Sequence, residues 1–152
     1  MGYTQSPPLT KEEIETLLKE AKIARFCTLD KDGTIHAMPV WFKYENGQIF
    51  VGTPAASHKA RNVKRNNNVT VLIDVEGPPA KGVLIRGKAK MTNVSLADVV
   101  SLFEKYMPID QAEKLAKGFL KMAKSVKITV KPERIVSFDY GRDTAYRNAH
   151  EG

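Results

Sequence analysis

The chain has 152 residues, of which 42% are hydrophobic and 27% are charged, the balance of an ordinary soluble protein. This length predicts one domain, residues 1–152, with its own core, and the short apolar runs exclude a membrane-spanning helix. The formal net charge of +7 is spread along the chain. Such a basic surface can attract nucleic acid, acidic lipid or a phosphorylated small molecule, and the charge alone does not choose among them.

The first eight residues have neither the charged nor the apolar segment of a signal peptide, so we expect a flexible arm there and a cytoplasmic protein. The single cysteine, Cys27, excludes an internal disulfide and fits a reducing compartment. Because Cys27 lies within an apolar strand pattern, we expect a buried, unreactive thiol.

The first predicted helix begins at Thr10, which has the spacing of a capping box with Glu13. The apolar residues after it recur every three or four positions, as on one face of an amphipathic helix: Ile14, Leu17, Leu18 and Ala21. We expect this helix to pack on a sheet.

Three strands are predicted next, at residues 25–29, 34–44 and 48–53, and the turn sequences between them end in Asp-Gly and Asn-Gly. Turns this short join antiparallel strands, so the three strands form consecutive hairpins. Pro39, within the second strand, has no N–H for a strand ladder. It predicts a bulge, a sheet edge, or a place where something other than a strand pairs.

A second helix is predicted from Ser57 to about residue 65, followed by strands at residues 69–75 and 82–91. Gly87 within the second of these strands indicates a bulge or a close approach of another backbone.

The remaining sequence predicts two more helices and a last strand. Ser95 begins one helix, and Asp110 caps another that continues to residue 122. Residues 126–138 have a strand pattern that Pro132 interrupts, and the charged segment that follows is rich in turn residues. The sequence therefore contains about six strands, mostly joined by hairpins, and three or four helices. This order predicts a mainly β, α+β fold, an antiparallel barrel or strongly curved sheet with appended helices.

No constellation of catalytic or metal-binding residues stands out. The three histidines, His36, His58 and His150, lie far apart and lack metal-ligand spacing, so no metal site is expected. The nucleophile-elbow, Walker A and dinucleotide-binding glycine motifs are all missing from the sequence.

The start of the second helix is the strongest candidate site. Ser57, His58 and Lys59 place a hydroxyl and two potential cations where the first N–H groups of a helix lack partners, which favours an anion. The basic residues after Lys59 carry no interleaved aromatics, so nucleic acid is not the expected ligand. A single phosphate needs only this helix start. The nearby Trp41 is either a core aromatic or the wall of a ligand site.

Four segments together resemble the FMN-binding split barrel of the pyridoxamine 5′-phosphate oxidase-like proteins. They are M-P-V-W-F-K at residues 38–43, G-T at 52–53, S-H-K-A-R-N at 57–62 and G-V-L-I-R-G-K-A-K-M at 82–91. The resemblance implies a homodimer with FMN in clefts at the subunit interface, and a flavin-dependent oxidoreductase without an obligatory catalytic side chain.

The resemblance also implies roles for particular residues. The strand that borders the flavin ring would be Met38, Pro39, Val40, Trp41, Phe42 and Lys43, and the phosphate would be held by Thr53, Ser57, His58 and Lys59. Arg86 and Tyr140 are the residues expected to reach the site of the partner subunit.

Several functions remain open within this fold. Met38 and His58 stand where the vitamin B6 oxidases commonly have arginine, so we expect a substrate other than pyridoxamine phosphate. Some members of the superfamily prefer a deazaflavin over FMN. The excess basic charge of this chain would suit the anionic tail of a deazaflavin equally well. A flavin- or heme-binding protein without turnover is a further alternative. The expected partners are a small-molecule substrate and a second copy of the chain, with no nucleic acid and no membrane.

Overall fold

The computed structural model describes residues 7–152. Its seven strands are β1 (Ala24–Leu29), β2 (Ile35–Val40), β3 (Lys43–Glu45), β4 (Gln48–Pro54), β5 (Asn68–Val75), β6 (Lys81–Asn93) and β7 (Ser125–Asp139). Its helices are α1 (Lys11–Glu20), α2 (His58–Arg65), α3 (Leu96–Phe103), α4 (Ile109–Met122), α5 (Thr144–Glu151) and the short 3₁₀ helix η1 (Tyr140–Arg142).

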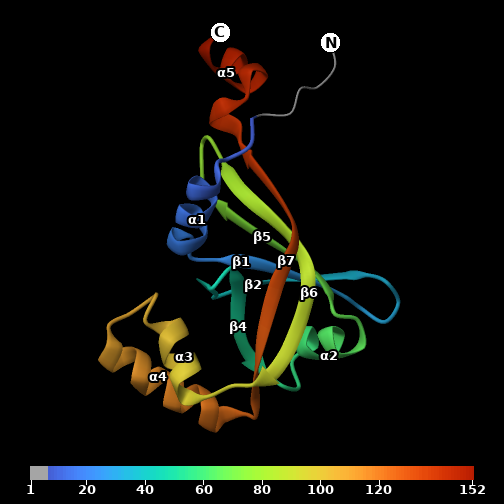
Figure 1. Cartoon of the computed structure of the whole chain (residues 1–152), viewed down its shortest axis with the longest axis vertical. Coiled ribbons are helices and arrows are strands. Elements are labelled where there is room, and N and C mark those ends of the chain that lie inside the picture. The colour runs from blue at the N-terminus through green and yellow to red at the C-terminus, as the bar shows by residue number, and fades with distance from the viewer. Residues whose placement is uncertain (1–6) are drawn as a thin grey trace.

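All seven strands form one antiparallel sheet in the order β2-β1-β5-β6-β7-β4-β3. β2 and β3 are separated by only two residues, Trp41 and Phe42, yet they lie at opposite edges of that order. The sheet must therefore curl until its two edges meet, which makes it a barrel that is split between β2 and β3. The predicted α+β fold, an antiparallel split barrel with appended helices, is confirmed. Figure 1 shows the long strands β6 and β7 side by side, with α3 and α4 at one end and α5 at the other.

One predicted strand, residues 34–44, is wrong as a single element because the chain leaves the sheet at Trp41 and Phe42. Phe42 is fully buried, and its backbone N–H donates to the hydroxyl of Tyr106 at 2.9 Å. A side chain from the segment between α3 and α4 thus takes the place of a strand partner. Pro39 lies in β2, an edge strand, which is one of the settings that its missing N–H predicted.

The prediction for Gly87 is confirmed, and the prediction for Pro132 is wrong. β7 continues through Pro132, which pairs with Gly87 of β6 next to a shift of register between Arg86 and Gly87. At a bulge the proline needs no regular ladder hydrogen bond, so the strand can pass through it. A Cβ atom on Gly87 would lie 2.2 Å from the carbonyl oxygen of Lys131, so the two backbones do approach closely.

The helix starts agree with the sequence except at α4. Capping boxes join Thr10 to Glu13 and Ser95 to Asp98. α4 begins at Ile109, with Pro108 as an N-cap residue that makes no side-chain cap hydrogen bond, so Asp110 lies inside the first turn, where its negative charge suits the helix dipole, and does not form the cap. The turn-rich tail after β7 contains η1 and the unpredicted helix α5.

The core has two parts. The larger lies inside the barrel, and the smaller joins α3 and α4 to Phe50. Most of the predicted N-terminal arm, residues 1–6, lies outside the described residues. Pro8 is attached to the body through its carbonyl, which accepts from Arg142 at 3.3 Å. Cys27 is partly exposed, not buried as expected, because it lies on the outward face of β1. No helix within residues 7–152 is long and apolar enough to cross a membrane.

Candidate anion and cofactor site

Three predicted phosphate ligands meet at the start of α2. Ser57 caps the helix, and its Oγ accepts from the backbone N–H of Ala60 at 3.3 Å. The hydroxyl of Thr53, at the end of β4, donates to Ser57 Oγ at 2.9 Å. Lys59 Nζ donates to Thr53 Oγ1 at 3.4 Å. Two hydroxyls, an ammonium and the free N–H groups of the helix start therefore converge, which is the donor set of a phosphate site.

Lys59 carries a positive charge that the fold does not neutralise. Its side chain is partly buried, and no carboxylate within residues 7–152 lies at ion-pair distance from it. Burial lowers the pKa of Lys59 from its ordinary value. A bound anion would supply the missing counter-charge, because a cation removed from water is stabilised by a nearby negative group.

His58, the first residue of α2, forms a stack with His36 of β2. The ring centroids are 4.0 Å apart and the planes are inclined by 20°. His58 Nε2 lies 2.6 Å from Asp30 Oδ1, in the turn between β1 and β2. Burial, followed by the charge of His58, lowers the pKa of His36. The helix start, the edge strand and the turn are thus joined through two imidazole rings and one carboxylate.

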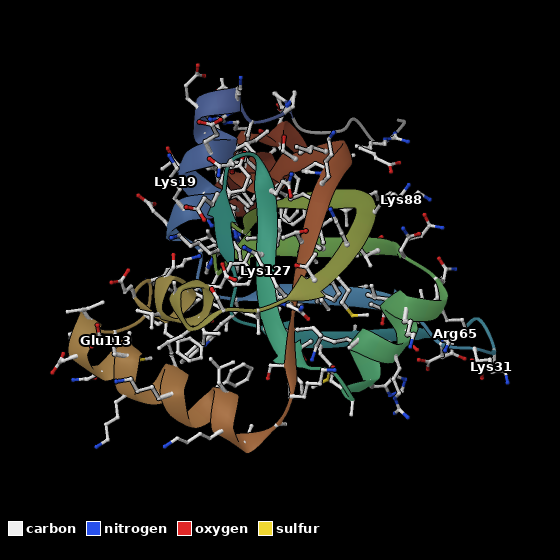
Figure 2. The ribbon with its side chains drawn as sticks, turned by 60° about the horizontal axis from the view of Figure 1, so that its bottom comes forward. Lys19, Lys31, Arg65, Lys88, Glu113 and Lys127 are labelled. Carbon is white, nitrogen blue, oxygen red and sulfur yellow. The ribbon has the colours of Figure 1, made fainter. Side chains whose placement is uncertain are left out.

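A second set of contacts fixes α2 against the end of β1. The amide of Asn62, which is only 2% exposed, donates to Thr28 Oγ1 at 3.0 Å and to Asp30 Oδ1 at 2.8 Å. Arg65 donates to Asn62 Oδ1 and to the carbonyl of Leu29, both at 2.8 Å. Figure 2 shows Arg65 and Lys31 together at this corner of the molecule. These bonds hold the helix start in a fixed position relative to β2.

β2 offers an open edge beside the helix start, because it pairs with β1 on one side only. Side chains alternate along a strand, so His36, Met38 and Val40 share one face of β2 and Pro39 lies on the other. Met38 is 44% exposed on that shared face. The unpaired backbone edge and the exposed side chain give a flat ligand a surface to lie against.

The structure gives the rest of the predicted ring-binding stretch other contacts. Trp41 stacks on Tyr106 at a centroid distance of 4.4 Å, and 38% of its surface remains exposed. The side chain of Phe42 is fully buried, and its carbonyl accepts from Lys105 Nζ at 3.2 Å. Lys43 bonds to Ser101 of α3. Of this stretch, Met38, Pro39 and Val40 lie in β2. The contacts of Trp41, Phe42 and Lys43 instead attach α3 and its connection to α4.

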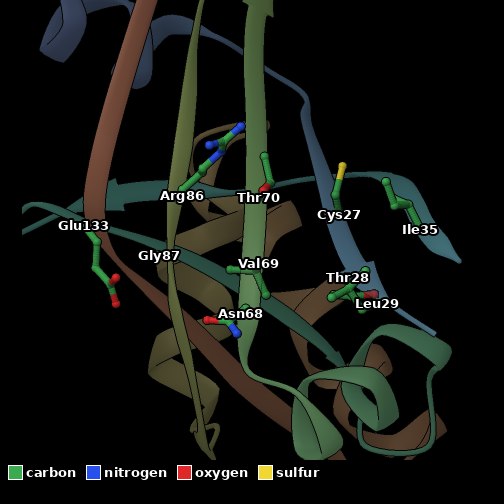
Figure 3. Close-up of a pocket in the computed structure, with 10 residues that line it drawn as sticks. All are labelled: Cys27, Thr28, Leu29, Ile35, Asn68, Val69, Thr70, Arg86, Gly87 and Glu133. Carbon is green, nitrogen blue, oxygen red and sulfur yellow. The ribbon is translucent and has the colours of Figure 1, made fainter. Parts of the chain in front are cut away.

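Arg86 and Tyr140 do not join the start of α2 in the same chain. Arg86 lines a pocket of about 400 Å³ on the outward side of the sheet, together with Cys27, Thr70 and Glu133 (Figure 3). Burial raises the pKa of the Cys27 thiol. Tyr140 packs against Phe138 and against Tyr146 of α5. Figure 1 shows α5 at the end of the molecule away from α2.

Sequence reasoning missed three residues of this site, His36, Asp30 and Asn62. The alternation of β2, which puts His36 on the same face as Met38, was a usable signal for the first. Asp30 and Asn62 are 32 residues apart in the chain, and their contact depends on how α2 packs on β1.

Comparison with known proteins identifies relatives of the chain. The family model described as pyridoxamine 5′-phosphate oxidase matches residues 10–133. General stress protein 26 of Bacillus subtilis (strain 168) is 31% identical over 85 residues, which cover 55% of this chain and 60% of that protein. The chain therefore spans about 60% of the length of this curated relative.

Two solved structures have the same fold. The conserved hypothetical protein Rv2991 of Mycobacterium tuberculosis aligns with a TM-score of 0.78 at 23% identity, over 91% of this chain and 90% of that one. A protein named F420 reductase aligns with a TM-score of 0.66 at 20% identity, over 83% of this chain and 98% of that one. At such identities the likeness shows the fold alone.

Proposed function

Because this chain belongs to the pyridoxamine 5′-phosphate oxidase family, we propose that it is an FMN-dependent oxidoreductase. The observation that carries the proposal is the uncompensated charge of Lys59 beside two hydroxyls at the start of α2. The open edge of β2 lies on the adjoining side of the barrel and gives the flavin ring a place next to its phosphate.

The donor set fits the cofactor. Lys59, Thr53, Ser57 and the N–H groups of α2 would hold the phosphate, and the backbone edge of β2 would bond the polar rim of the ring. When bound, a flavin supplies hydride or electron transfer, while the protein binds and orients it. We therefore assign no side chain as a catalytic acid, base or nucleophile.

We propose a substrate other than pyridoxamine phosphate. The arginines of the C-terminal segment are engaged within the chain, since Arg142 bonds Glu13 and lies 3.4 Å from Asp139. Arg147 Nε lies 3.9 Å from Glu151 of its own helix. These charges are less available to a substrate phosphate, which supports a different chemistry on the substrate side of the ring.

The test compares FMN with riboflavin, which lacks the phosphate. Lys59→Ala should weaken FMN binding about ten- to hundredfold, the loss of one charge-assisted hydrogen bond, and should leave riboflavin binding nearly unchanged. Lys64→Ala is the matched control, because Lys64 is an exposed lysine on the same helix. A colourless protein that binds neither FMN nor a deazaflavin would refute the proposal.

A deazaflavin is the second candidate cofactor, supported by the shared fold with F420 reductase. Its phosphate would use the same helix start. Mass spectrometry of the molecule released from purified protein separates the two cofactors directly.

We also propose that the protein is a cytoplasmic homodimer that closes its flavin site at the subunit interface. Three large apolar side chains are exposed around the open β2 edge: Ile35 at 68%, Met38 at 44% and Trp41 at 38%. A second copy packed there would cover them. Arg86 makes no side-chain hydrogen bond or ion pair with residues 7–152, so it is available to such a partner. Sedimentation equilibrium that gives a mass near the 16.9 kDa of one chain would refute the dimer.

A further inference from the structure

The stacked imidazoles at the start of α2 carry an inference that depends on the proposed phosphate site. We propose that His58 is a proton-dependent cation of that site, held by Asp30 and supported by His36, so that binding of a phosphate group takes up a proton. The proposal concerns how tightly the phosphate is held at each pH, and Asp30 is a positioning residue that acts through His58.

The environment of each ring decides where the proton of the pair resides. His58 Nε2 has a carboxylate partner, Asp30, at 2.6 Å. The buried Nδ1 of His36 has no hydrogen-bond partner among residues 7–152. A protonated His36 would leave that N–H unsatisfied and would place two like charges 4.0 Å apart between ring centres. The proton therefore belongs to His58, and His36 stays neutral as a flat support.

Because of the charge of Asp30, the proton on His58 affects how tightly an anion binds at the start of α2. Two donors, the amide of Asn62 and the ring of His58, hold the pKa of Asp30 below its usual range. The carboxylate is therefore charged at neutral pH. When His58 is neutral, Asp30 leaves a negative charge beside the first residue of α2. When His58 is protonated, the pair is neutral and the charge of Lys59 acts on the anion without opposition.

The other charged groups around the pair are lysine, arginine and aspartate side chains, residue types that ordinarily keep their charge near neutral pH. Lys59 acts on His36 from the same helix as His58, and Arg65 is bonded to Asn62 and to Leu29 of β1. Lys31 and Asp32 belong to the turn that carries Asp30, and the charges of the two aspartates repel each other. Of the residue types at this corner, only histidine ordinarily changes its charge in the neutral range.

A calorimetric titration of the protein with FMN and with riboflavin tests this role of His58. It uses two buffers that differ in ionisation enthalpy, from about pH 6 to about pH 8.5. The difference between the binding enthalpies in the two buffers gives the number of protons taken up. The wild type should take up more protons on binding FMN than His58→Gln does. As the pH rises, its preference for FMN over riboflavin should fall by up to about tenfold per pH unit. Protonation of the FMN phosphate itself is common to all variants and cancels in this comparison.

Two further variants sharpen the result. Asp30→Asn keeps an oxygen that Asn62 can bond but removes the negative charge. The increase in preference for FMN as the pH falls should therefore begin at a lower pH than in the wild type. His150→Gln is the matched control, because His150 is exposed on α5 and bonds only Tyr146. It should behave as the wild type.

The outcomes separate this inference from the function on which it rests. If neither ligand binds, the proposed function fails and this inference fails with it. If FMN binds with a preference that depends on Lys59, but His58→Gln takes up as many protons as the wild type, the phosphate site stands and the role of His58 is overturned.

Discussion

A pair of Gly→Ala substitutions tests the geometry of the barrel with one chemical change at two places. Gly87 lies in β6 at the bulge opposite Pro132 of β7. A Cβ atom there would lie 2.2 Å from the carbonyl oxygen of Lys131 and 3.2 Å from a side-chain carbon of Val130. Because the closest obstacle is backbone, no rotation of a side chain can relieve it.

The cost follows from how far the strands must separate. Real Cβ atoms essentially never come within 3.0 Å of such an atom. β6 and β7 would have to move apart by roughly 0.8 Å at a point where both pack on the barrel core, and overpacking of this kind costs about 1–3 kcal/mol. For a chain of this length that corresponds to a fall of roughly 2–12 °C in the melting temperature.

Gly118 in α4 is the matched site. A Cβ atom there meets nothing within 4 Å, and the residue is exposed inside a helix. Gly118→Ala should therefore stabilise the protein by about 0.5–1 kcal/mol, because alanine loses less backbone entropy in a helix. Urea denaturation of both variants measures the two signs. A Gly87→Ala protein as stable as the wild type would contradict the close approach of β6 and β7.

Two more predictions concern single contacts. The Arg142 guanidinium holds the pKa of Glu13 at about 2, so the stabilisation from this carboxylate is present above about pH 4.5 and is lost as the pH falls through about 2. Glu13→Gln, which can still cap α1, should flatten the acid side of a plot of melting temperature against pH, and an unchanged acid side would show that the pair contributes nothing. Tyr106→Phe leaves the buried N–H of Phe42 without its acceptor and should cost about 1–3 kcal/mol in chemical denaturation. A loss well below that range would mean that the N–H finds another partner.

The parts of the fold that the sequence predicts are those set by neighbours in the chain. The capping box of Thr10 and Glu13 spans three residues, and both bonds are present. The Asn46-Gly47 turn has positive φ at both residues, 52° and 72°, as a two-residue hairpin requires. Gly87 is informative because a glycine inside a strand usually marks a bulge or a close approach of another backbone.

Local sequence patterns do not predict contacts between segments that lie far apart in the chain. The strand predicted over residues 34–44 is broken by Tyr106, which lies 64 residues beyond Phe42. Nothing near Phe42 in sequence indicates that the helical insertion between β6 and β7 returns to satisfy its backbone. The same insertion takes Trp41 into a stack, so an aromatic that suggests a ligand wall also serves to dock a helix pair.

In the candidate site, local patterns likewise predict some residues, whereas others come together only through contacts between distant segments. Its proposed phosphate half depends on Ser57 and Lys59, which share one helix start, and local sequence patterns find them. The proposed tuning of that half by pH depends on His36 and Asp30, which come from an earlier strand and turn and meet the helix only after the barrel curls. The proposed ligand class thus follows from local sequence, whereas the proposed response to pH depends on packing. A relative that keeps the Ser-x-Lys helix start but lacks Asp30 should therefore bind the same phosphate with a different dependence on pH.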